Sequence, residues 1–131
     1  MTDTIRYLNT DLDLASPDEL APLAAALEAR GLLRLHVSRR DDGLCHATFE
    51  DGEQHDEPAP NVAAMLAVVE SLERPLRALW DGCVVRRLDA GYECGARPWG
   101  FGHELPGEVL ARMAALGLSL RITLYPPAPP A

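Results

Sequence analysis

The chain has 131 residues, of which 47% are hydrophobic and 24% charged, so its composition is that of a single globular domain and excludes a disordered or fibrous protein. Its 20 acidic and 12 basic residues give a net charge of −8, which repels a phosphate backbone and argues against a nucleic-acid partner. Every basic residue is an arginine, which excludes chemistry that needs a lysine, such as a Schiff base or a Walker-type phosphate site.

The sequence also predicts where the protein resides. Its apolar runs are all shorter than the roughly 20 residues that a membrane-spanning helix needs, and residues 1–6 lack the basic-then-apolar order of a signal peptide. We therefore expect a cytoplasmic protein with no membrane partner. The cysteines show no C-x-x-C spacing, so we expect reduced thiols and no cofactor; they are Cys45, Cys83 and Cys94.

The first predicted elements are a strand and a helix. The side chains of residues 8–14 alternate between the two faces that a strand with one buried side requires, and they predict a strand at about residues 4–14. Ser16, Pro17 and Glu19 form the pattern of a capping box and predict a helix that starts at Pro17. Gly31 is the expected stop of that helix.

Two more alternating segments, residues 33–37 and 45–49, flank an Asp-Asp-Gly sequence and predict a β-hairpin. A two-residue turn would set Val37 opposite a polar residue, so the burial pattern favours a three-residue loop with Gly43 in the left-handed conformation. In that register the core pairs are Val37–Ala47 and Leu35–Phe49.

The remaining elements follow an acidic, proline-bounded connection at residues 50–60. We expect a helix from about Asn61 that Pro75 ends or kinks, then a short helical segment at 75–80 and a strand at 83–94. Further on we predict a loop at 95–104, a helix from Pro106 to Gly117, and a strand at 118–125. A proline-rich tail, residues 126–131, cannot continue a strand ladder.

These elements predict an α+β domain spanning residues 1–125, in the order β-α-β-β-α-β-α-β. We expect a mixed, mainly antiparallel sheet with helices on one face. The first six elements match a ferredoxin-like core, and the last two are a C-terminal α-β extension of its sheet.

Two carboxylates, Asp11 and Asp13, share the polar face of the first strand and have the spacing of a magnesium-binding pair. The phosphatases that use such a D-x-D pair need a lysine and a buried apolar strand before it. This chain has neither feature. The favoured interpretation is a solvated strand face that also discourages pairing at a sheet edge.

The hairpin carries a candidate metal pair, His36 and His46, on its polar side, where Ser38 would face His46 and His36 would face Thr48. A metal site needs a third ligand, for which Glu50 or His55 are the candidates. Ordinary surface histidines are the favoured alternative. Cys45 and His46 are chain neighbours on a strand and point to opposite faces, so they do not form a nucleophile and base, and we expect Cys45 in the core.

The loop between residues 95 and 104 is the least ordinary segment, because two aromatic residues lie among glycines ahead of a helix. We expect Trp99 or Phe101 to anchor this loop in the core. The alternative is a binding loop for a small anion or a protein partner, formed by Arg97, Trp99, Phe101 and His103.

Two segments resemble small bacterial proteins of unknown function: YLNTDLDL at residues 7–14 and LARMAALGLSLRITLY at 110–125. The C-terminal helix-glycine-strand-tyrosine unit is also similar to the end of domain of unknown function 4279. The resemblance implies an immunity-type inhibitor of a bacterial toxin and brings no catalytic residue with it.

Three functional hypotheses follow. The first is a non-enzymatic protein-binding module that takes a basic protein partner, because the chain is acidic and lacks a coherent catalytic set. The second is an enzyme that binds a small ligand or a metal through the hairpin histidines or the aromatic loop. The third is self-association through an edge strand, either of the hairpin or at the C-terminus.

Overall fold

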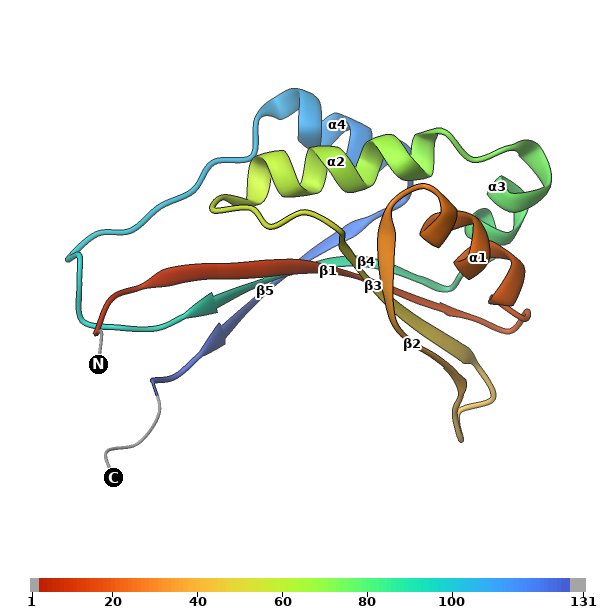
Figure 1. The fold of residues 1–131 in the computed structure, drawn as a ribbon, viewed down its shortest axis with the longest axis horizontal. Coiled ribbons are helices and arrows are strands. Elements are labelled where there is room, and N and C mark those ends of the chain that lie inside the picture. Colours follow the sequence, from red (N-terminus) through yellow and green to blue (C-terminus); the bar gives the residue numbers. More distant parts are fainter. Residues whose placement is uncertain (1–2, 128–131) are drawn as a thin grey trace.

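The computed structural model describes residues 3–127, which form a five-stranded sheet with its helices layered on one face (Figure 1). The strands are β1 (Arg6–Ser16), β2 (Leu32–Arg39), β3 (Cys45–Asp51), β4 (Val85–Glu93) and β5 (Ser119–Tyr125). The helices are α1 (Ala21–Ala29), α2 (Pro58–Glu70), α3 (Arg74–Asp81) and α4 (Gly107–Ala115). None of these helices is long and apolar enough to span a bilayer.

The sheet has the strand order β2-β3-β1-β4-β5, in which β4 and β5 run parallel and all other neighbours are antiparallel. The predicted α+β fold with a mixed, mainly antiparallel sheet is therefore confirmed. The ferredoxin-like core stays a prediction. The tail prediction concerns residues 126–131, of which 128–131 lie outside the described residues.

The hydrophobic core lies between the helices and the middle three strands. β1 and β4 both present leucines to this layer, Leu12 opposite Leu88 in the sheet, and β3 adds Phe49. Side chains of the helices fill the space above them and are fully buried: Leu23, Leu27, Val62, Met65, Leu66 and Trp80.

The hairpin of β2 and β3 has the predicted loop. Gly43 adopts a φ of 82°, and the amide of Arg40 donates to the carbonyl of Leu44 across 2.9 Å, so three residues form the turn. Val37 lies opposite Ala47, as predicted. The predicted Leu35–Phe49 pair is wrong, because the register shifts at Leu35 and brings Arg34 opposite Phe49.

The predicted starts of two helices are wrong by a few residues. α1 begins at Ala21 rather than at Pro17, because Ser16 is still the buried end of β1 and its Oγ accepts the amide of Asp18 across 3.1 Å. α2 begins at Pro58, before Asn61, since a proline in the first turn lacks only an amide that needs no helical partner. Pro75 lies at the start of α3, as the predicted break requires.

Trp80 connects α3 to the end of α4. Its ring is fully buried, and its indole N–H donates to the carbonyl of Leu116 across 3.0 Å. Leu116 is the C-cap that follows the last residue of α4, and Gly117 comes next with a φ of 70° before β5 begins. The indole therefore holds the turn that delivers the chain into β5.

We predict that Trp80→Phe lowers the free energy of unfolding by about 1–3 kcal/mol, because it removes this hydrogen bond and leaves a void in the core. Urea unfolding followed by circular dichroism measures the change. Trp99→Phe is the matched control, since that ring is fully exposed and its replacement is expected to change stability by less than about 0.5 kcal/mol. Equal stability of the two variants would contradict the role given to Trp80.

Candidate functional site

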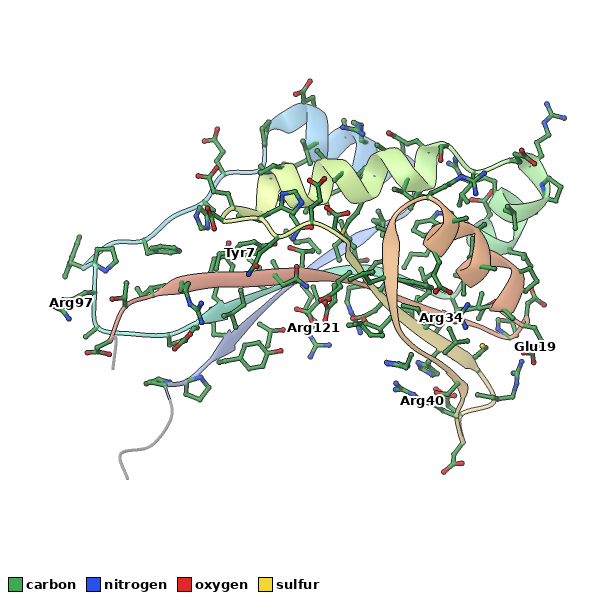
Figure 2. All side chains as sticks on the ribbon, viewed as in Figure 1. Tyr7, Glu19, Arg34, Arg40, Arg97 and Arg121 are labelled. Atoms are coloured by element: carbon green, nitrogen blue, oxygen red, sulfur yellow. The ribbon has the colours of Figure 1, made fainter. Side chains whose placement is uncertain are left out.

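The loop that connects β4 to α4 makes a wide excursion beyond the end of β1 before it returns to the helix layer (Figure 1). It is tied at its start to the first described residues of the chain. The amide of Ile5 donates to the carbonyl of Arg97 across 2.7 Å, and the amides of Ala96 and Arg97 both donate to the carbonyl of Asp3. Arg97 itself lies at the outer bend of the loop with its side chain exposed (Figure 2).

The predicted aromatic anchor of this loop is not Trp99, whose side chain is 102% exposed. Phe101 is 40% exposed and packs edge-on against His103, with ring centroids 4.8 Å apart. His103 attaches the loop to the sheet, because its Nδ1 lies 3.1 Å from the hydroxyl of Tyr92 and its ring stacks on the Tyr92 ring. The histidine therefore performs the anchoring that we expected of a larger aromatic residue.

Tyr92 belongs to a buried aromatic and polar cluster. Its ring lies 5.4 Å from that of Tyr7 on β1, whose hydroxyl accepts a hydrogen bond from Nδ2 of Asn61 across 2.8 Å. Asn61 comes from the first turn of α2 and is fully buried. The cluster thus links β1, β4, α2 and the loop, and Phe101 packs edge-on against its Tyr92 ring with centroids 6.1 Å apart.

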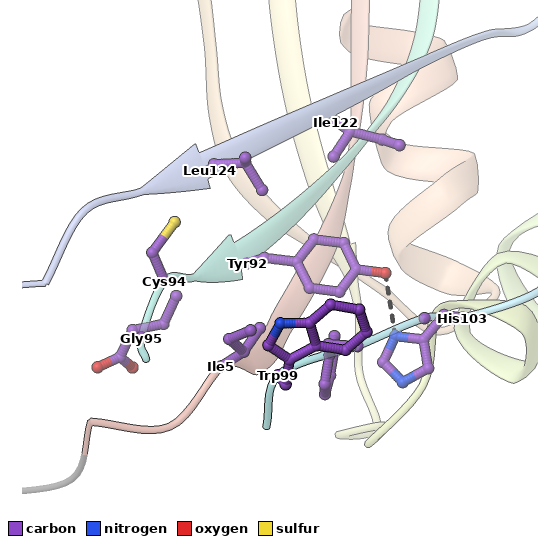
Figure 3. Close-up of a pocket in the computed structure, with 11 residues that line it drawn as sticks. Ile5, Tyr92, Cys94, Gly95, Trp99, His103, Ile122 and Leu124 are labelled. Atoms are coloured by element: carbon purple, nitrogen blue, oxygen red, sulfur yellow. Dashed lines mark hydrogen bonds between the residues drawn. The ribbon is translucent and has the colours of Figure 1, made fainter. Parts of the chain in front are cut away.

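An apolar hollow of about 560 Å³ opens between this loop and the C-terminal half of β5 (Figure 3). Its walls are the exposed aromatic side chains of the loop on one side and the apolar row of β5 on the other. The side chains that define it are Ile5, Tyr92, Trp99, Phe101, Ile122 and Leu124.

A second, more polar hollow of about 990 Å³ lies on the other side of Phe101 and His103, which line both. Its far wall is the acidic loop ahead of α2, with Asp56 and Glu57 exposed at the rim. Arg97 lines neither hollow. We call the two hollows together the aromatic cleft; it has one apolar half and one acidic half.

The cleft is open because the helix layer leaves β5 uncovered. α4 packs against α2, and every residue of β5 except Thr123 is exposed. The side chain of Ile122 is therefore 61% exposed although it points to the helix face. The sequence did not predict this exposure, because an uncovered apolar row has the same alternation as a buried one.

The hairpin histidines do not converge on a metal site. Ser38 faces His46 and His36 faces Thr48, as predicted. However, Nε2 of His46 lies 2.7 Å from Oδ2 of Asp42, and Nε2 of His36 lies 3.1 Å from Nη2 of Arg40. The candidate third ligands are engaged elsewhere, Glu50 with Asn9 and His55 with Asp51.

Within residues 3–127 no three histidine, cysteine or acidic side chains come close enough to hold a metal ion together. Cys45 is buried in the core while His46 lies on the opposite face of β3, so the predicted core position of Cys45 is confirmed. Among the described residues, the hairpin therefore brings no metal-ligating cluster together.

Asp11 and Asp13 lie on the face of the sheet that carries no helices. Asp13 accepts from Thr48 across 3.0 Å and pairs with Arg87 at 3.3 Å. β1 is the central strand, so the interpretation that these carboxylates protect a sheet edge is wrong. Partial burial and the neighbouring carboxylates of Asp13, Glu50 and Asp89 raise the pKa of Asp11 to about 6.

A raised carboxyl pKa means that ionised Asp11 destabilises the folded state, and this cost grows as the pH rises from about 4 to about 6. We predict that Asp11→Asn raises the free energy of unfolding at pH 7 by on the order of 1 kcal/mol and changes it little at pH 4. Urea unfolding across this pH range measures both values. A gain in stability that is the same at pH 4 and pH 7 would contradict the assigned cause.

Comparison with known proteins finds no family model, no curated protein and no solved structure that matches this chain. The resemblance to domain of unknown function 4279 therefore stays a prediction. The fold and the site define an α+β protein with an uncovered aromatic cleft between a loop and an edge strand.

Proposed function

We propose that the protein is a non-catalytic, cytoplasmic protein-binding module that takes a basic, apolar-anchored segment of a partner protein in the aromatic cleft. The fully exposed ring of Trp99 beside the uncovered apolar hollow is the observation that carries this proposal. An inhibitor of the immunity type, as the sequence resemblance implies, is a protein of this class.

The apolar half of the cleft supports the proposal because it exposes several large apolar side chains next to one another. Isolated exposed apolar side chains are common, but here Trp99, Phe101, Ile122 and Leu124 line one hollow. A contiguous apolar surface of this kind marks an interaction site in soluble proteins. Tryptophan and tyrosine are also the residues that most often dominate binding energy at protein interfaces.

The acidic half supports a basic partner. Asp56 and Glu57 lie at the rim of the polar hollow, whose arginine, Arg6, is neutralised by an ion pair with Glu93 across 2.8 Å. The net charge of −8 extends this field over the whole molecule and accelerates the approach of a positively charged surface. An arginine or lysine side chain has both a cationic head for the carboxylates and an alkyl chain for the aromatic rings.

The enzyme hypothesis has weaker support. It requires a nucleophile or a metal beside a base, whereas the hairpin histidines are paired with Asp42 and Arg40, and His103 is bonded to Tyr92. These pairings hold side chains in place around the cleft and the hairpin loop. They favour a binding surface over a reaction centre.

We predict that selection of a random peptide display library on the immobilised protein enriches peptides that combine arginine or lysine with an apolar residue. Enriched peptides are expected to change the fluorescence of Trp99 on binding and to bind at least about tenfold more weakly to Trp99→Ala and Phe101→Ala. Raising the salt concentration is expected to weaken the binding of these peptides to the parent protein, because the carboxylates at the rim are exposed and their charges are screened.

Leu33→Ala is the control for this experiment, because Leu33 is a similarly exposed apolar residue on β2, at the opposite edge of the sheet. Circular dichroism confirms that each variant is folded. Peptides that bind Trp99→Ala as tightly as the parent protein, or a selection that converges on acidic peptides, would refute the proposal.

A further inference from the structure

The two edges of the sheet differ in how they are protected against pairing with another strand. β2, at one edge, has an irregular register at Leu35 and presents charged residues along its length. Both arginines of β2 form ion pairs. Arg34 pairs with Glu28 of α1, and Arg39 pairs with Glu19 in the segment before α1. A bulge and charged side chains are the usual devices that block edge-to-edge association.

β5, at the other edge, has none of these devices. It pairs with β4 in an unbroken register from Ser119 to Tyr125 and contains no proline. Its single charged residue, Arg121, points to the open face of the sheet and lies 3.7 Å from Asp89 of β4. The strand therefore presents a regular and largely apolar edge with one charged side chain.

The direction of the backbone groups along β5 follows from its pairing with β4. The carbonyl of Tyr125 accepts the amide of Cys94, so Tyr125 and the residues at two-residue intervals before it direct their polar groups toward β4. The alternate residues Leu120, Ile122 and Leu124 direct their N–H and C=O groups away from the sheet. Their side chains are also the apolar row on the helix face.

We propose that a second copy of this chain pairs with β5 across a two-fold axis at Ile122, which extends the sheet through both molecules. A two-fold axis makes the two β5 strands antiparallel. In this register Ile122 lies opposite the partner's Ile122, and Leu120 lies opposite the partner's Leu124. Each such pair exchanges both of its N–H···O=C bonds, so all the outward groups of the strand are used.

The side chains fit the same register. On the helix face only leucine and isoleucine side chains meet, and Leu110 of α4, which is exposed, lies beside them. On the open face Arg121 lies opposite the partner's Thr123, so like charges do not face each other. The strand is therefore complementary to itself in backbone and in side chains, which is the condition for a symmetric interface.

The interface is small. One seven-residue strand with its adjoining side chains buries less than the roughly 1,600 Å² of a standard protein interface. The net charge of −8 on each copy also opposes association at low salt. We therefore expect a reversible dimer that forms in the micromolar range and strengthens as the salt concentration rises.

Sedimentation velocity of the full chain from about 5 µM to about 500 µM tests this proposal. The weight-average mass is expected to rise from the monomer value of 14.2 kDa toward twice that value. Ile122→Lys places two like charges opposite each other on the axis and is expected to weaken the dimer at least about tenfold. Leu33→Lys is the matched control, because it introduces the same charge at the β2 edge, and it is expected to leave the dimer unchanged.

Cross-linking tests the register. In a Cys94→Ser background, Ile122→Cys places two thiols on residues whose Cα atoms are about 5.5 Å apart, within reach of a disulfide under mild oxidation. Leu124→Cys is the matched control, because its own copy across the axis lies about 14 Å away. The proposal is overturned if the chain stays monomeric at every concentration, or if Leu33→Lys dissociates the dimer and Ile122→Lys does not. Equal cross-linking at both positions would also overturn it.

The dimer and the proposed peptide binding are separate claims. Trp99 lies on the loop and not on β5, so Trp99→Ala is expected to lose peptide binding and keep the concentration-dependent mass. Ile122→Lys is expected to weaken the dimer at least about tenfold, but Ile122 also lines the apolar hollow, so Trp99→Ala is the variant that separates the two claims. A failure of one claim therefore leaves a distinct experimental result from a failure of the other.

Discussion

The direction of β5 is the constraint on which the functional surface depends. β5 runs parallel to β4, and parallel neighbours cannot be joined by a tight turn, so the chain must return along the helix face before it can enter the sheet again. The return path is the aromatic loop followed by α4. Because α4 packs against α2 and leaves β5 uncovered, the loop and the C-terminal half of β5 face each other across an open cleft.

Much of the fold could be predicted from the sequence, because local patterns and tertiary packing agree over most of the chain. The hairpin loop is an example: the alternation on both strands and the left-handed Gly43 require the same three-residue turn. The start of α1 shows where such agreement ends. Ser16 has the capping chemistry, but its burial at the end of β1 postpones the helix to Ala21.

The candidate site was predicted only in part. The loop around Trp99 was singled out by its aromatic residues, and Phe101 and His103 do line the cleft. Its other wall could not be predicted, because the alternation of Ile122 and Leu124 says which face they occupy and not whether a helix covers them. Coverage depends on where the helices lie over the sheet, which the alternation within one strand does not determine.

The two tryptophans of this chain occupy opposite environments, and this gives the protein a pair of built-in optical reporters. Trp80 is enclosed in the core with its indole N–H bonded to a carbonyl, whereas Trp99 stands fully in solvent at the cleft. A collisional quencher dissolved in water reaches the second ring and not the first. The emission of the intact protein therefore separates into one signal from the core and one from the cleft, each readable without an added label.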